Sequence, residues 1–184
     1  MRVAFEALPR RIFLDSCTVQ TLRDYGGYIY DGEPIADGDR IHRVADGYAN
    51  VDALQVIWLV SQRAMFDWIV SESSLREARD KGDVGHLRWF YEIADYTRGC
   101  LERGGPTAES DALARRLDEP RFGYLSTKDR ELLRDAVWLR CDSFLTMERR
   151  LPRNAAHISR QLGIRVLTPL GYWEMLRPWA ALWY

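Results

Sequence analysis

Four carboxylates occupy equivalent places along the chain, each near the end of an apolar run or the start of a helical segment. They are Asp15, Glu77, Asp129 and Glu148. Asp15 directly follows the run "IFL", and Glu148 lies just beyond "FLT", which ends at Thr146. In a parallel sheet the carboxyl ends of the strands and the helices that follow them share one edge, where ligands bind. We therefore expect the four acids to converge there.

Carboxylates gathered in this way have a defined chemistry. Without a counter-ion they repel one another, which raises their pKa values and destabilises the fold. A hard divalent cation relieves the repulsion, and a ligand set of oxygens without His or Cys favours Mg²⁺ or Mn²⁺ over zinc. Such an ion activates a bound water for in-line attack on a phosphodiester. The pattern predicts metal-assisted phosphodiester hydrolysis.

Each acid also has a plain structural explanation. Three of them match helix-cap patterns, which stabilise a helix by about 1 kcal/mol: Asp15 before a helix at 16–22, Ser74 with Glu77, and Ser126 with Asp129. Glu148 makes no such cap, and its alternative is a solvated turn residue that pairs with Arg149 or Arg150. Both explanations stay open for every acid.

Other catalytic classes fit the sequence less well. A phosphatase of the haloacid type needs a second acid two residues after Asp15, where Cys17 stands, and no glycine-rich phosphate loop is present. A metal-free ribonuclease needs paired histidines, yet His42, His86 and His157 lie outside every motif.

Composition sets the remaining bounds. The chain has 184 residues, is 47% hydrophobic and has a formal net charge of −1, so any anionic partner must meet a local basic patch. The cysteines form no CxxC pair, which fits a reducing cytoplasm. The N-terminal residues do not have the pattern of a signal peptide, and the sequence contains no apolar run of 18 residues, so we expect no membrane-spanning segment. Lys81 and Lys128 are the only lysines, and arginine's planar fork suits phosphate contacts.

The elements needed to position the acids alternate along the chain. Strands are expected at 12–14, 66–71, 143–146 and 165–168, and helices at 16–22, 50–63, 74–82, 85–103, 109–117, 127–140, 155–163 and 169–177. Residues 24–50 are rich in Gly and Asp and are expected to form a loop or insertion with a helical turn near 41–45. Strands separated by helices predict one α/β domain over 1–184, a three-layer α/β/α sandwich with a small, mostly parallel sheet.

The segments "RRIFLDSCTV", "SSLREAR", "KDRELLRDAVWLRCDSFLTMERRL" and "GIRVLTP" together resemble the PIN-domain family, whose best-known members are toxin ribonucleases of VapC type. The resemblance covers residues 12–176. It implies a small parallel α/β/α sandwich whose acidic pocket binds Mg²⁺ or Mn²⁺ and cuts RNA, and a possible antitoxin partner. It assigns the metal and the catalysis to Asp15, Glu77, Asp129 and Glu148, and it gives Thr146 the role of orienting the pocket.

One departure from the family pattern bears on this expectation. The family's last acid is usually Asp in a T-x-D motif, whereas Glu148 is one methylene longer. An inactive PIN-like module that acts through RNA or protein contact is therefore the alternative function.

Substrate and partner contacts complete the expectations. Arg130, Arg149 and Arg150 are expected to contact RNA phosphates, with a solvated basic face as the alternative. The aromatic tail at 170–184 is expected to pack in the core, with a homodimer or antitoxin interface as its alternative.

Overall fold

A small parallel sheet forms the centre of the molecule. The computed structural model describes residues 4–82, 88–104 and 106–183. The strands are β1 (Arg11–Leu14), β2 (Asp67–Ile69), β3 (Ser143–Leu145) and β4 (Arg165–Leu167). They lie in the order β2-β1-β3-β4, and every pairing is parallel. The predicted strand positions and their parallel arrangement are confirmed.

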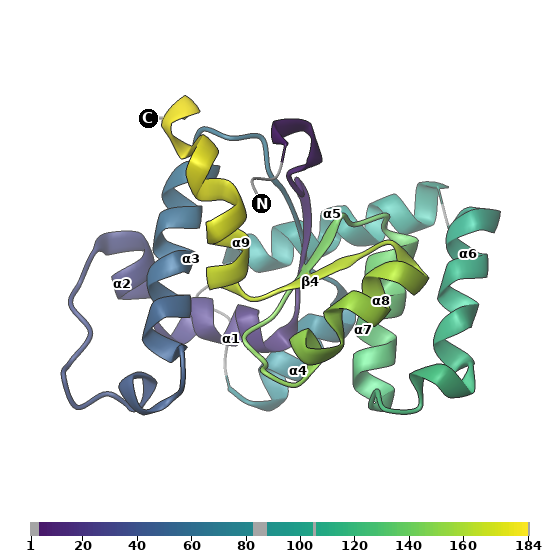
Figure 1. Cartoon of the computed structure of the whole chain (residues 1–184), viewed down its shortest axis with the longest axis horizontal. Coiled ribbons are helices and arrows are strands. Elements are labelled where there is room, and N and C mark those ends of the chain that lie inside the picture. Colours follow the sequence, from purple (N-terminus) through teal and green to yellow (C-terminus); the bar gives the residue numbers. More distant parts are fainter. Residues whose placement is uncertain (1–3, 83–87, 105, 184) are drawn as a thin grey trace.

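Helices cover both faces of this sheet, so the predicted three-layer α/β/α sandwich is also confirmed. One face carries α1 (Ser16–Asp24), α3 (Gly47–Ser61) and α9 (Pro169–Leu176). The other carries α6 (Ala108–Arg115), α7 (Thr127–Trp138) and α8 (Ala155–Leu162). Figure 1 shows α3 and α9 to the left of the strands and α6, α7 and α8 to the right.

Alternation along β1 divides the core between the two layers. Ile12 and Leu14 pack into the cluster on the α1, α3 and α9 side. Phe13 points to the opposite face, where its ring stacks on Phe144 of β3 with centroids 5.3 Å apart. All four side chains are at most 1% exposed, so β1 is a central strand buried on both faces.

The connection from α1 to α3 is more ordered than its composition indicates. It contains α2 (Gly26–Asp31) and the 3₁₀ turn η2 (Arg40–Arg43), and α3 begins at Gly47 rather than at residue 50. The helical turn predicted near 41–45 is confirmed by η2, whereas the prediction of a loop was wrong for α2 and for the first residues of α3. Two glycines open α2 and conceal it from a propensity argument.

Two further helices lie beside β2. They are α4 (Glu72–Asp80) and α5 (Arg88–Gly104). A helical pair was expected here, but the residues that would join its members, 83–87, lie outside the described part of the chain, and His86 with them. α4 contacts both α1 and α7, and therefore one helix of each layer.

The aromatic tail packs into the fold, as the core alternative predicted. After α9 the chain continues as the 3₁₀ helix η6 (Arg177–Leu182). Tyr172 is fully buried and donates a hydrogen bond to the carbonyl of Pro9 at 2.9 Å, and the rings of Trp179 and Trp183 contact Phe5. Tyr184 lies outside the described residues. Within the described ranges, no helix combines the length and apolarity needed to cross a bilayer.

Candidate functional site

Asp15 lies where β1 gives way to α1, at the carboxyl edge of the sheet. Its side chain caps α1 by accepting a hydrogen bond from the backbone N–H of Thr18 at 2.7 Å, so the predicted cap is confirmed. Its second oxygen accepts from the hydroxyl of Thr146 at 2.5 Å. Thr146 directly follows β3 and is completely buried. Asp15 therefore connects the ends of two neighbouring strands to the start of a helix.

Burial makes the charge of Asp15 costly. Asp15 is 4% exposed, and burial raises the pKa of its carboxyl group to about 6, against the hydrogen bonds from Thr146 and Thr18, which lower it. The negative charge of Glu148 raises this pKa further. The two acids therefore repel each other at the same edge of the sheet.

Glu148 reaches this edge through the same threonine. Its backbone N–H donates to the Thr146 hydroxyl oxygen at 3.0 Å, so that hydroxyl accepts from Glu148 while it donates to Asp15. The Glu148 side chain is exposed, and its Oε1 lies 3.6 Å from the Sγ of Cys17. At this edge of the sheet Asp15 is therefore buried, and Glu148 is exposed to solvent.

Glu77 lies on α4 and is held by lysines. The Oε1 of Glu77 lies 3.7 Å from the Nζ of Lys81 and 3.5 Å from the Nζ of Lys128. The Lys81 Nζ also lies 3.8 Å from the Sγ of Cys17. Glu77 is therefore connected to Glu148 through an ammonium and a thiol rather than by direct contact.

The proposed cap role of Glu77 was wrong. The N-cap of α4 is Ser71, whose hydroxyl accepts from the backbone N–H of Ser74 at 3.2 Å. The helix therefore begins at Glu72, and Glu77 lies more than a full turn inside it, beyond the reach of a capping box. Glu77 has no helix-end role that would explain it.

Asp129 serves the start of α7, as its capping pattern predicted. Ser126 accepts from the Asp129 N–H at 3.1 Å, and Asp129 accepts from the Ser126 N–H at 3.0 Å. One carboxylate oxygen is thereby engaged within the helix end. The neighbouring Lys128 connects this helix start to Glu77.

The structure brings two of the four acids together and gives the other two different partners. Asp15 and Glu148 interact around Thr146, whereas Glu77 pairs with lysines and Asp129 closes a capping box. Among the described side chains, no group of three or more His, Cys, Asp or Glu residues is arranged to hold a metal ion. The pocket of four carboxylates around one cation stays a prediction.

Residues outside the predicted set also line this region. Glu131 accepts hydrogen bonds from Ser73 at 3.0 Å and from Arg76 at 2.8 Å, which ties α7 to α4. One turn later, burial raises the pKa of Asp135, opposed by hydrogen bonds from the hydroxyls of Ser71 and Ser73. The spacing of four residues places both acids on one face of α7. That spacing was visible in the sequence, but the facing element was not.

The basic residues and histidines have structural partners of their own. Arg150 donates to the carbonyl of Tyr124 at 3.2 Å, while Arg149 is exposed and Arg130 half-buried. The Nδ1 of His157 lies 3.0 Å from the hydroxyl of Tyr124. The ring of His42 stacks instead on Tyr48, with centroids 5.0 Å apart. Neither histidine contacts a predicted acid, so the pairing that metal-free cleavage requires is not formed by these two residues.

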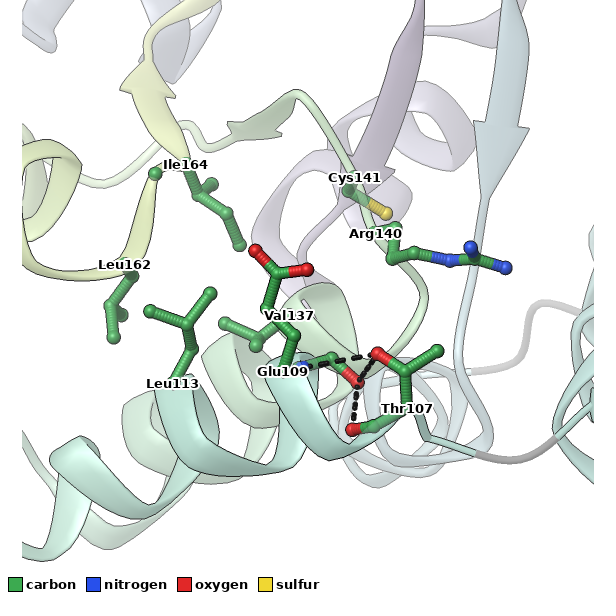
Figure 2. Close-up of a pocket in the computed structure, with 10 residues that line it drawn as sticks. Thr107, Glu109, Leu113, Val137, Arg140, Cys141, Leu162 and Ile164 are labelled. Carbon is green, nitrogen blue, oxygen red and sulfur yellow. Dashed lines mark hydrogen bonds between the residues drawn. The ribbon is translucent and has the colours of Figure 1, made fainter.

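A separate cavity of about 240 Å³ lies at the opposite edge of the sheet, where β3 and β4 begin. Figure 2 shows Glu109 rising from α6 toward Ile164, with Leu113 and Leu162 beside it and the Arg140 guanidinium directed away. The walls mix aliphatic side chains with polar ones, and Glu109 is the one carboxylate among the described residues that line the cavity. It therefore offers no second set of carboxylates.

Comparisons of the chain with models of protein families, with curated proteins and with solved structures found no match. The function is argued from the geometry of the carboxyl edge of the sheet.

Proposed function

We propose that this chain is a PIN-like endoribonuclease that depends on Mg²⁺ or Mn²⁺. The observation that carries the proposal is the pair formed by Asp15 and Glu148 at the ends of adjacent parallel strands: the Thr146 hydroxyl donates to the Asp15 carboxylate and accepts from the Glu148 backbone N–H, and the charge of Glu148 raises the pKa of Asp15. Ligand sites of parallel α/β folds lie at this edge. A fold that needed only a helix cap at Asp15 would have no reason to add the charge of Glu148 above it.

The donor chemistry at this edge fits a hard cation. The available groups are carboxylate and hydroxyl oxygens, which Mg²⁺ and Mn²⁺ prefer. The pKa of Asp15 is raised by burial and by Glu148, and a bound cation would favour the charged form of both acids. Asp15 and Glu148 would hold the ion, and Glu77 and Asp129 would complete the set from α4 and α7. When bound, the ion would supply an activated water for attack on the phosphodiester.

The protein's own groups would fix the geometry of this site. Thr146 and the Thr18 N–H hold both Asp15 oxygens in place without the help of solvent, which is the preorganisation that catalysis requires. Arg149 and Arg150 follow Glu148 directly and, with Arg130, would neutralise RNA phosphates.

An inactive PIN-like module is the second candidate, and one specific observation favours it. Glu77 is covered by both lysines of the chain, which leaves less negative charge at the edge for a divalent ion. Such a module would bind RNA or a protein, with an antitoxin or a second copy as possible partners, and would not turn over.

Cleavage of an RNA panel, both single-stranded and structured, separates the two. Wild type is compared with Asp15→Asn, Glu148→Gln and the control Glu6→Gln in Mg²⁺, Mn²⁺ or EDTA. Glu6 is exposed on the 3₁₀ turn η1 (Phe5–Ala7), before β1, at the far edge of the sheet. We expect metal-dependent cleavage that Asp15→Asn abolishes and Glu6→Gln retains. Folded wild type that cuts no RNA in any metal would refute the nuclease and favour the binding module.

A further inference from the structure

The two lysines of the chain meet at one carboxylate. The sequence has 26 basic residues, Lys and Arg together, and only Lys81 and Lys128 are lysines. Lys81 caps the end of α4, and Lys128 lies in the first turn of α7, yet both ammonium groups approach the same Oε1 of Glu77. All other ion pairs among the described residues use arginine. The lysines are therefore concentrated where the acids were predicted to converge.

Lys81 differs from an ordinary surface lysine in what surrounds it. Glu77 and Lys81 are four residues apart, a spacing that stabilises many exposed helices, and a lysine at a helix end is also favourable. Neither role accounts for its second contact. Its Nζ lies 3.8 Å from the Sγ of Cys17 on α1, and that Sγ lies 3.6 Å from the Oε1 of Glu148. The ammonium therefore lies between Glu77 and the half of the site formed by Asp15 and Glu148.

The contacts between the lysine ammonium groups and Glu77 are long and exposed enough for a bound cation to replace them. Both lysine–Glu77 separations exceed 3.4 Å, longer than a charge-assisted hydrogen bond, and the Lys81 and Lys128 side chains are 40% and 65% exposed. Lysine carries a compact charge on a flexible stem, whereas arginine would form a rigid forked contact. A side chain of this kind can neutralise a carboxylate and still leave it.

We infer that Lys81 is a tethered counter-cation that competes with a divalent ion for Glu77. The inference rests on the proposed function, in which Glu77 is a ligand of an Mg²⁺ or Mn²⁺ ion that Asp15 and Glu148 also hold. In the cation-free protein, Lys81 limits repulsion between Glu77 and the acids beyond Cys17. Binding of the ion requires its ammonium to move away, so Lys81 sets the metal affinity of the site.

Mn²⁺ binding followed by electron paramagnetic resonance tests this inference without any RNA. Wild type is compared with Lys81→Met, which keeps the aliphatic stem and removes the charge. Arg177→Met is the matched control, because Arg177 is exposed at the far end of α9. A second variant, Lys128→Met, removes the lysine that pairs with Glu77 but, unlike Lys81, does not contact Cys17. Thermal unfolding of each variant in EDTA verifies that it is folded.

We expect Lys81→Met to bind Mn²⁺ about fivefold more tightly, the factor that corresponds to the upper value for an exposed ion pair. Lys128→Met should change the affinity by about twofold or less because its side chain is more exposed, and Arg177→Met should leave it unchanged. Folded Lys81→Met that binds Mn²⁺ no more tightly than wild type would overturn the inference, as would the absence of Mn²⁺ binding to both proteins.

RNA cleavage by the same samples tests the proposed nuclease activity separately from the role of Lys81. Metal-dependent cleavage by wild type, with no change of Mn²⁺ affinity in Lys81→Met, would support the proposed nuclease activity and refute the role of Lys81 as a counter-cation. Tighter Mn²⁺ binding by Lys81→Met, without cleavage by either protein, would support the role of Lys81 and refute the nuclease activity.

Discussion

Replacing Asp15 by Asn should stabilise the cation-free protein, and the gain should grow with pH. The pKa of Asp15 is raised from 3.8 to about 6, chiefly by burial. The folded state therefore binds a proton more tightly than the unfolded state, and the free energy of unfolding falls as pH rises from about 4 to about 6. This direction is opposite to that of a salt-bridged aspartate. At 1.36 kcal/mol per pH unit, the loss for wild type amounts to about 3 kcal/mol at pH 7.5.

Asn keeps the shape and can still cap α1, but it carries no charge to bury. We therefore expect Asp15→Asn and wild type to be similar in stability at pH 4, and the variant to be more stable by about 2 to 3 kcal/mol at pH 7.5. Urea unfolding in EDTA, followed through the fluorescence of the seven tryptophans, measures both proteins across this range. Glu6→Gln should show no such trend.

Added Mn²⁺ provides the second arm of this experiment. A cation held by Asp15 should return stability to wild type above pH 6 and leave Asp15→Asn unaffected. A difference between the two proteins that does not vary with pH would refute the reasoning, because Asp15 would then carry its charge at no cost in the folded state.

Three further changes test two contacts at the carboxyl edge of the sheet and the backbone that follows α7. Thr146→Val removes the hydroxyl from Asp15 and should cost about 2 kcal/mol in urea unfolding, with a larger loss at pH 7.5 than at pH 5 because that hydrogen bond lowers the Asp15 pKa. Ser126→Ala should lower the unfolding free energy by about 1 kcal/mol and Ser126→Asp should restore it; equal stability of all three proteins would contradict the capping box. Arg140 follows α7 with a φ of 53°, a left-handed conformation that is strained for a residue with a Cβ but not for glycine. Arg140→Gly should therefore raise the free energy of unfolding by about 1 kcal/mol, with a higher melting temperature, and Arg140→Ala should not.

Much of the fold followed from the sequence because local patterns and tertiary structure agree. The runs that contain Ile12 and Phe144 are short and apolar, as strands buried on both faces must be, and the apolar residues of α7 recur at helical spacing and face the core. The helix α2 was missed because it opens with Gly26 and Gly27, and glycine is among the weakest helix formers. The start of α4 was misplaced because Ser71 and Ser74 both offer a capping hydroxyl, and only tertiary position selects Ser71.

Less of the candidate site than of the fold could be predicted from the sequence. The order of the strands brings Asp15 and Glu148 to one edge, and this follows from a parallel sheet alone. The partners of Glu77 did not follow, because Lys81 belongs to its own helix but Lys128 comes from a helix far along the chain. The same reason conceals Glu131, whose partner Ser73 lies on α4. Long side chains that cross between helices depend on packing that no local pattern encodes.

The double use of Asp15 and Asp129 has a consequence for how a lineage carrying this fold could diverge. Both acids cap helices, so a descendant that lost its activity would still be selected to keep a capping residue at each position. Glu148 caps no helix and is exposed, so mutation could remove it at little cost to stability. In a set of related chains, the residue at position 148 would therefore report on retained activity far better than the two aspartates would.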